Sequence, residues 1–218
     1  MISNWDNILW DLDGTVTDPY EGITNSILFS LKYYPNIPTP KREELREFIG
    51  PPLAAKYAEF FALSEEEAKQ AVEHYREYYR PYGLYQNKLY DGIEELLAKL
   101  KHNGKKVYLA TSKPEEFAKK ILVHYDIDKY FDGVYGSTLD GSIVKKEDVI
   151  KYILDNEGCN TEKTVMIGDT QYDIIGAHKL GLDAVGVTYG YGRREDIENS
   201  APCAIVDSVE ELEKLLFS

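Results

Sequence analysis

Residues 8–15, which read ILWDLDGT, decide the fold of this chain. The stretch begins with three apolar residues and stops at two acids and a glycine, a pattern that predicts a buried strand of a parallel sheet. Open sheets of this kind carry their sites at the carboxyl ends of the strands. Asp11 and Asp13 are two residues apart, so both carboxylates face one side of an extended chain, and Gly14 permits a sharp turn after them. Both acids are candidate site residues, although a single D-x-D-G also occurs as a turn that caps a helix.

Length and composition limit the possible functions. A chain of 218 residues can bury a substantial core, as one large domain or as a domain with an insertion. The net charge of -13 argues against nucleic acid or an anionic membrane as partner, because association would begin with repulsion. Cys159 and Cys203 fit packing roles in a reducing compartment, and we recognise no signal peptide or membrane span. We therefore expect a cytoplasmic protein, a monomer or homodimer, that acts on a small molecule.

The order of predicted helices and strands indicates two domains. Residues 16–86 carry only helical patterns, whereas strands alternate with helices of roughly ten to fifteen residues from residue 87 onward. Such alternation builds right-handed βαβ units on a parallel sheet. We expect an α/β fold in which residues 1–15 and 87–218 form a Rossmann-like doubly wound parallel sheet. Residues 16–86 are expected to form an inserted α-helical domain.

A second predicted strand ends at Thr111 and Ser112 and leads into a helix. Hydroxyl groups and free backbone N–H groups at a helix N-terminus form a ready anion site. The alternative is a capping box between Ser112 and Glu115, with Thr111 as an ordinary residue at a strand end. This segment alone favours the capping box.

A further predicted strand ends at Asp169, and Asp173 follows one helical turn later. Both acids can face one point, which suits a hard cation, although acids in a first helical turn also serve as caps. Because acid pairs end two strands, we favour a metal, and octahedral Mg²⁺ suits a site with few carboxylates. Lys145 or Lys146 would add a second cation, although a single lysine is usually a solvated surface charge.

Together these residues predict phosphoryl transfer. Asp11 is the candidate nucleophile that forms an aspartyl-phosphate, and Asp13 is the candidate acid/base that protonates the leaving alkoxide and then activates water. Thr111 would hold the phosphoryl group, while Mg²⁺ and a lysine neutralise charge on its oxygens. The sequence contains no P-loop, no G-x-S-x-G and no H-E-x-x-H motif.

These motifs, in this order, resemble those of the haloacid dehalogenase (HAD) superfamily of phosphohydrolases. The resemblance covers essentially the whole chain, because the helical insertion is similar to that superfamily's type-one cap. It implies Asp11 as nucleophile, Asp13 as acid/base, and Thr111 and Lys146 as the residues that hold the phosphoryl group. It also implies that four aspartates help to bind Mg²⁺: Asp11, Asp13, Asp169 and Asp173. Of these, Asp13 adds its backbone carbonyl.

Two further segments indicate a branch of the superfamily. Residues 146–150, KEDVI, are similar to the K-x-D-V-I form of phosphoglycolate phosphatase-like members, which favours Lys146 and leaves Lys145 open. Residues 48–53, FIGPPL, are similar to the cap's specificity loop in a phosphoglycolate phosphatase-like or 5'-nucleotidase-like branch, although they also suit a helix–helix turn. The resemblance implies five substrate-binding residues: Gly50, Pro51, Thr111, Ser112 and Lys146.

The leading interpretation is a Mg²⁺-dependent phosphatase for a small phosphomonoester, of the phosphoglycolate or nucleoside 5'-monophosphate class. One alternative is a HAD sugar-phosphate mutase, which differs in what accepts the phosphoryl group. Another is a phospho-accepting signalling or binding module without turnover. A phosphonatase would need a Schiff-base lysine in the cap, for which Lys56 is available, although lysine on such a helix usually faces solvent.

Overall fold

A computed structural model describes residues 5–140 and 142–218. The described chain divides into two compact units. The core unit is made of two segments, the chain up to Asp18 and the chain from Leu89 to Ser218. The helical unit runs from Pro19 to Lys88. Among the described residues, no helix combines the length and the apolar character that crossing a bilayer would need.

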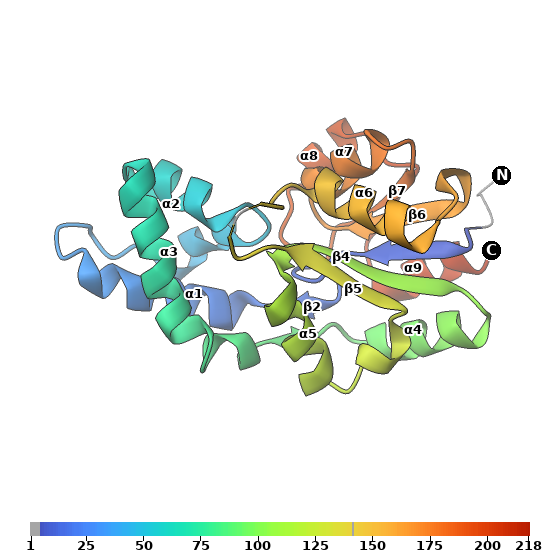
Figure 1. Ribbon diagram of the computed structural model, residues 1–218, viewed down its shortest axis with the longest axis horizontal. Coiled ribbons are helices and arrows are strands. Elements are labelled where there is room, and N and C mark those ends of the chain that lie inside the picture. Colours follow the sequence, from blue (N-terminus) through green and yellow to red (C-terminus); the bar gives the residue numbers. More distant parts are fainter. Residues whose placement is uncertain (1–4, 141) are drawn as a thin grey trace. The chain divides into compact units, whose positions relative to one another are not determined.

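The core unit is built on one parallel sheet of six strands (Figure 1). In spatial order the strands are β5 (Gly133–Ser137), β4 (Lys106–Pro114), β1 (Asn7–Trp10), β6 (Thr164–Gly168), β7 (Asp183–Val187) and β8 (Ala204–Val206). The chain runs outward from β1 to β4 and β5, then returns to the other side of β1 and continues through β6, β7 and β8. This reversal beside β1 makes the sheet doubly wound, and it confirms the predicted α/β fold.

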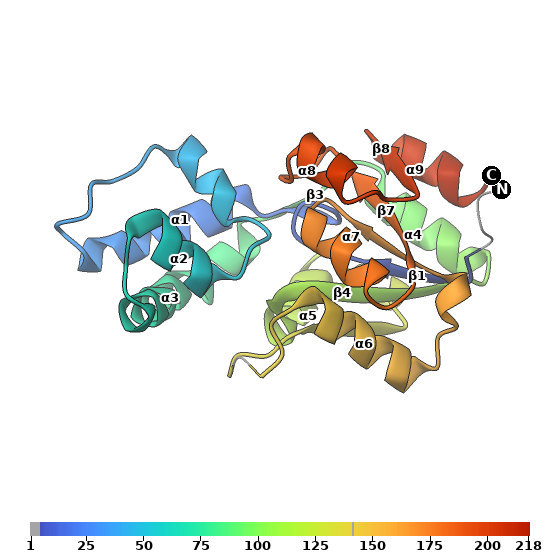
Figure 2. The same cartoon turned by 90° about the horizontal axis from the view of Figure 1, so that it is seen from above.

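Helices cover both faces of this sheet (Figures 1 and 2). One face carries α4 (Ile93–His102), α5 (Glu115–His124) and α9 (Val209–Leu216), and the other carries α6 (Lys146–Glu157), α7 (Gln171–His178) and α8 (Arg194–Asn199). The described part of this unit also contains the 3-10 helices η4 (Asp128–Tyr130) and η5 (Thr161–Lys163). Val149, Ile150 and Ile153 recur at helical spacing on α6 and pack in one buried cluster with Leu9 and Met166 of the central strands. This packing fixes the start of α6 beside the carboxyl end of β1.

The helical unit has its own buried centre. Its elements are α1 (Tyr20–Ser30), η1 (Leu31–Tyr33), η2 (Arg42–Phe48), α2 (Leu53–Phe61), α3 (Glu65–Tyr79) and η3 (Gly83–Tyr85). Helix α3 packs against α1 and α2. It starts with the predicted capping box, in which Glu67 N donates to Ser64 Oγ at 3.3 Å and Ser64 N donates to Glu67 Oε2 at 2.9 Å. The rings of Phe48 and Tyr57 are fully buried, with centroids 5.3 Å apart.

One detail differs from the sequence-based prediction of helices alone between residues 16 and 86, because β2 (Thr17–Asp18) is a strand within this range. It pairs with β3 (Lys88–Leu89), just beyond the range, in a two-stranded sheet where the chain leaves the core unit and comes back to it. The segment Arg42–Phe48 is helical as expected, with 3-10 geometry. Strands of two residues are too short to show an alternating pattern, so periodicity could not reveal them.

Candidate active site

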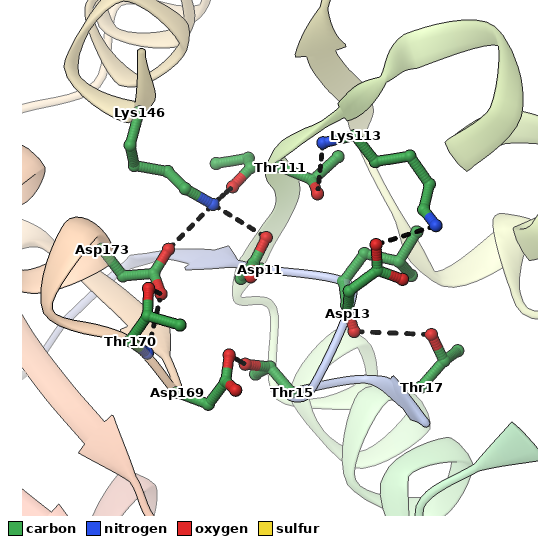
Figure 3. A network of polar contacts seen from close by, with 12 residues as sticks. Asp11, Asp13, Thr15, Thr17, Thr111, Lys113, Lys146, Asp169, Thr170 and Asp173 are labelled. Carbon is green, nitrogen blue, oxygen red and sulfur yellow. Dashed lines mark hydrogen bonds and ion pairs between the residues drawn. The ribbon is translucent and has the colours of Figure 1, made fainter. Parts of the chain in front are cut away.

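The central strands deliver the predicted site residues to one place. Trp10 on β1 lies opposite Leu109 on β4 and Ile167 on β6, so the residues that follow emerge at the same level of the sheet. Figure 3 shows their side chains gathered at these strand ends. The structure brings together six of the predicted residues: Asp11, Asp13, Thr111, Lys146, Asp169 and Asp173.

Lys146 begins helix α6 and reaches back into this site. Its ammonium Nζ lies 2.7 Å from Asp11 Oδ1 and 2.8 Å from Asp173 Oδ1, and it donates to the carbonyl oxygen of Ala110 at 2.7 Å. Burial alone would lower the pKa of Lys146, but the carboxylates of Asp11 and Asp173 outweigh burial and raise it, so the side chain stays charged. The neighbouring Lys145 is exposed. Of the two lysines that the sequence left open, Lys146 is the one that lies among the carboxylates.

Asp11, Asp169 and Asp173 form an acidic cluster that could hold a cation. One carboxylate oxygen of each lies within 4.8 Å of the others, and all three residues are buried. Burial, and then the charges of Asp11 and Asp173, raise the pKa of Asp169 well above its ordinary value. A bound cation would offset the burial and the repulsion together. Because every ligand in the cluster is a carboxylate oxygen, the residues fit Mg²⁺.

Asp173 caps its helix, which is one of the two roles that the sequence offered, and its other carboxylate oxygen faces the site. Its Oδ2 accepts hydrogen bonds from Thr170 N at 3.1 Å and from the Thr170 hydroxyl at 2.7 Å, which caps helix α7. Its Oδ1 faces Lys146, and burial raises its pKa. The helix cap therefore fixes the carboxylate in the orientation that the site uses.

The loop after β7 holds Asp169 in place, and the sequence did not lead us to predict it. Tyr191 N donates to Asp169 Oδ2 at 2.7 Å, and the Thr15 hydroxyl donates to Oδ1 at 3.4 Å. A Cβ added at Gly190 would lie 2.4 Å from Asp169 Oδ2, and one at Gly192 would lie 1.9 Å from the Asp169 carbonyl oxygen. The available signal was the G-Y-G that closely follows a buried strand, since glycines permit such close backbone approach.

Asp13 is held by a lysine that was not predicted either. Lys113 Nζ lies 2.7 Å from Asp13 Oδ2, and the two side chains are 5% and 13% exposed. Burial raises the pKa of Asp13 despite the opposing charge of Lys113. The available signal was the position of Lys113 two residues after Thr111, which places both side chains on one side of an extended strand.

Thr111 and Ser112 lie on β4, which continues to Pro114 before α5 begins at Glu115. Thr111 is buried, its hydroxyl accepts a hydrogen bond from Lys113 N at 3.2 Å, and Ser112 is half-buried. Among the residues that the structure describes, no side chain caps α5, whose N-cap residue is Pro114. The capping box between Ser112 and Glu115, which the segment alone favoured, was therefore wrong, because the strand extends two residues beyond Ser112.

Comparison with known proteins agrees with this geometry. A family model described as haloacid dehalogenase-like hydrolase matches residues 8–187, a range that contains all four motifs. The chain belongs to this family. The HAD-like hydrolase is 43% identical over 212 residues to a 5'-nucleotidase of Pseudomonas aeruginosa, which covers 97% of this chain and 96% of that protein.

Two further comparisons extend this result. The HAD-like hydrolase is 35% identical over 211 residues to the tyrosine-protein kinase PtkA of Mycobacterium tuberculosis, which covers 96% of this chain and 72% of that one. Its fold matches the crystal structure of a "predicted phosphatase" from Clostridium acetobutylicum with a TM-score of 0.95 and 44% identity, over 99% of both chains. The family, the 5'-nucleotidase relative and the matching phosphatase structure support the conclusion that this HAD-like hydrolase is a phosphatase.

Three residues named from the sequence of this HAD-like hydrolase belong to the helical unit. Gly50 has a φ of +105°, which a residue with a side chain rarely adopts, and Pro51 follows it. Their part in substrate binding stays a prediction. Lys56 was expected to face solvent, as lysines on such helices usually do, but its side chain is only 11% exposed. Its Nζ lies 2.8 Å from Glu47 Oε2. Burial would lower the pKa of Lys56, but Glu47 and Glu59 raise it, so this amine is a poor Schiff-base nucleophile.

Proposed function

We propose that this HAD-like phosphatase hydrolyses a small phosphomonoester, with Mg²⁺, through an aspartyl-phosphate on Asp11. The observation that carries the proposal is the set of groups around the Asp11 carboxylate. Asp11 belongs to an oxygen-ligand cluster with Asp169 and Asp173, and its Oδ1 also contacts the ammonium of Lys146, which pairs with Asp173 as well. A nucleophilic carboxylate beside a metal site and a fixed cation suits attack on a dianion.

In the first step the Asp11 carboxylate attacks phosphorus, and the bond between phosphorus and the leaving oxygen breaks. Asp13 donates a proton to that oxygen, so an alcohol leaves. The Thr111 hydroxyl and the Lys146 ammonium hold the oxygens of the transferring group. The raised pKa of Asp13 suits this role, because a carboxyl group must carry a proton to act as an acid.

In the second step water attacks the phosphorus of the aspartyl-phosphate, the bond between phosphorus and the Asp11 oxygen breaks, and Asp13, now a carboxylate, takes a proton from that water. The Asp11 carboxylate and inorganic phosphate are the products. Mg²⁺ held by Asp11, Asp169 and Asp173, and by the backbone carbonyl of Asp13, would neutralise charge on the phosphoryl oxygens.

The substrate class that we propose is phosphoglycolate or a nucleoside 5'-monophosphate. The name of the P. aeruginosa relative, a 5'-nucleotidase, supports the second of these. We also propose that residues 19–88 act as the cap, with Gly50 and Pro51 in the loop that contacts the leaving group. The net charge of -13 supports a small-molecule substrate over nucleic acid or a membrane surface, and the free Cys159 and Cys203 support a cytoplasmic location.

The test measures phosphate release from a panel of phosphomonoesters, with and without Mg²⁺, for the wild type and for Asp11→Asn. We expect Mg²⁺-dependent release that Asp11→Asn abolishes without loss of folding, as circular dichroism would show. An Asp11→Asn variant with near wild-type turnover would refute the aspartyl-phosphate. Isomerised sugar phosphate in place of free phosphate would indicate a mutase, and a stable phospho-adduct would indicate a phospho-accepting module.

A second candidate function follows from the relative named tyrosine-protein kinase. In that case a tyrosine hydroxyl, in place of water, would accept the phosphoryl group from Asp11, and a nucleoside triphosphate would supply it. Incubation of the protein with a tyrosine-containing peptide and ATP radiolabelled on its γ-phosphate distinguishes the two functions. Label on the peptide would support the kinase, and label in free phosphate alone would support hydrolysis.

A further inference from the structure

We propose that Lys113 is a positioning residue for the acid/base Asp13, which it holds through one oxygen so that the other carries the transferred proton. The inference rests on the proposed function, since it assigns a role in the same reaction. It concerns a lysine outside the motif residues that were predicted from the sequence.

The contact is specific to one oxygen of the carboxylate. Lys113 Nζ lies 2.7 Å from Asp13 Oδ2 (Figure 3). Within the described part of the chain, Asp13 Oδ1 is buried and takes part in no hydrogen bond. A buried polar atom without a partner is unusual in a folded protein and calls for an explanation. The leaving oxygen of a substrate is the partner that Asp13 needs for catalysis.

The chemistry of an ammonium group decides which oxygen carries the proton. A charged lysine has three donors and no acceptor, so Lys113 can only donate to Oδ2. When Asp13 is protonated, the proton must therefore sit on Oδ1, because Oδ2 already faces a donor. In the first step this Oδ1 proton passes to the leaving oxygen, which receives the electron pair of the breaking P–O bond, and Oδ1 becomes the base of the second step. Lys113 keeps its own protons throughout.

The arrangement of the two lysines supports separate roles. Lys146 contacts Asp11 and Asp173, whereas Lys113 contacts Asp13. Both ammonium groups are buried, with side chains 3% and 5% exposed, so neither is an ordinary surface charge. The site thus has one cation at its nucleophile and another at its acid, and the removal of each should affect a different part of the reaction.

The experiment is a double-mutant cycle of Lys113→Met and Asp13→Asn, read as kcat/KM on two kinds of substrate. This ratio reports the steps up to aspartyl-phosphate formation. An alkyl phosphate has a leaving group that needs a proton, whereas p-nitrophenyl phosphate has one that leaves without it. We expect Lys113→Met to lower kcat/KM by about 100-fold on the alkyl phosphate and by less than about 10-fold on p-nitrophenyl phosphate, within the range that general acid catalysis supplies. In the Asp13→Asn background, Lys113→Met should cause no further loss.

Two results would overturn the inference. One is an equal loss on both substrates, which would mean that Lys113 binds the phosphoryl group or only supports the fold. The other is a full further loss in the Asp13→Asn background, which would mean that Lys113 acts independently of Asp13. The double variant also guards against misfolding, because it leaves no buried carboxylate without its partner.

The matched control is Lys106→Met. Lys106 begins the same strand, and it also faces an aspartate, Asp132 at 3.1 Å, but its side chain is 58% exposed. We expect Lys106→Met to turn over both substrates at the wild-type rate. The failure of the proposed function would look different, since the wild type itself would then release no phosphate or Asp11→Asn would remain active.

Discussion

Replacement of Lys146 by methionine is the most informative single change in the site. Methionine keeps an unbranched chain of similar length but removes the ammonium group, and with it the contacts to Asp11, Asp173 and the Ala110 carbonyl at 2.7 to 2.8 Å. The carboxylates are left buried without the lysine that balances them. The removal of one partner of a buried ion pair costs about 3–5 kcal/mol of stability. In a chain of this size that corresponds to a fall in Tm of roughly 6–20 °C.

Tryptophan fluorescence during heating would measure this change in the core unit specifically. The chain has two tryptophans, Trp5 and Trp10, and both are buried in the core unit. We expect Mg²⁺ to restore part of the lost stability, because the ion brings positive charge back to the same carboxylates. Phosphate release should fall by about 10²–10³-fold, the usual effect of removing one group that stabilises transition-state charge.

Lys145→Met is the control, since that side chain is the exposed neighbour on the same segment. Its free energy of unfolding should stay within about 0.5 kcal/mol of the wild type, as for most surface substitutions. If Lys146→Met matched this control in Tm and in turnover, the account of Lys146 as the cation that balances Asp11 and Asp173 would be wrong.

Three further predictions concern the surroundings of the site. Asp169→Asn should raise the Tm of the metal-free protein at pH 7 and abolish the Tm increase caused by Mg²⁺. The pKa of Asp169 is raised in the folded state, so its ionisation destabilises the fold as pH rises above about 4, the ordinary pKa of aspartate in an unfolded chain. Below that pH the Tm advantage of Asp169→Asn should vanish. Gly192→Ala should weaken Mg²⁺ binding in calorimetry and destabilise the core by about 1–3 kcal/mol, since the new Cβ meets the Asp169 backbone at 1.9 Å; wild-type affinity would contradict this. Lys56 should form no borohydride-trapped adduct with a carbonyl substrate, because Glu47 and Glu59 keep its amine protonated, and trapping seen by mass spectrometry would revive the phosphonatase interpretation.

The sequence was informative wherever a residue's position followed from its own strand. Asp11, Thr111 and Asp169 each end an apolar run, and parallel strands present their carboxyl ends at one edge, so their meeting was predictable. Gly14 was expected to allow a sharp turn. It has a φ of +87°, and a Cβ there would lie 2.2 Å from Asp169 Oδ2.

The sequence was less informative where a contact depends on distant parts of the chain. Lys113 looks like any strand-end lysine until its burial against Asp13 is known. The loop that holds Asp169 comes after a different strand, and nothing local shows that Tyr191 N points at a carboxylate. The capping box at Ser112 was plausible locally, but the strand pairing Pro114↔Ser137 keeps the chain extended past it. The assignment of residues 16–86 as a cap stays a prediction.

The pairing of β2 with β3 has a consequence for how such a chain can diversify. The segment that leaves the core after Asp18 and the segment that comes back at Leu89 run beside each other as neighbouring strands. An insertion of any length or fold can therefore begin and end at this pair without a change in the register of the six-stranded sheet. Evolution can exchange the inserted module as a unit, while the six-stranded sheet and the carboxylates at its strand ends are inherited intact.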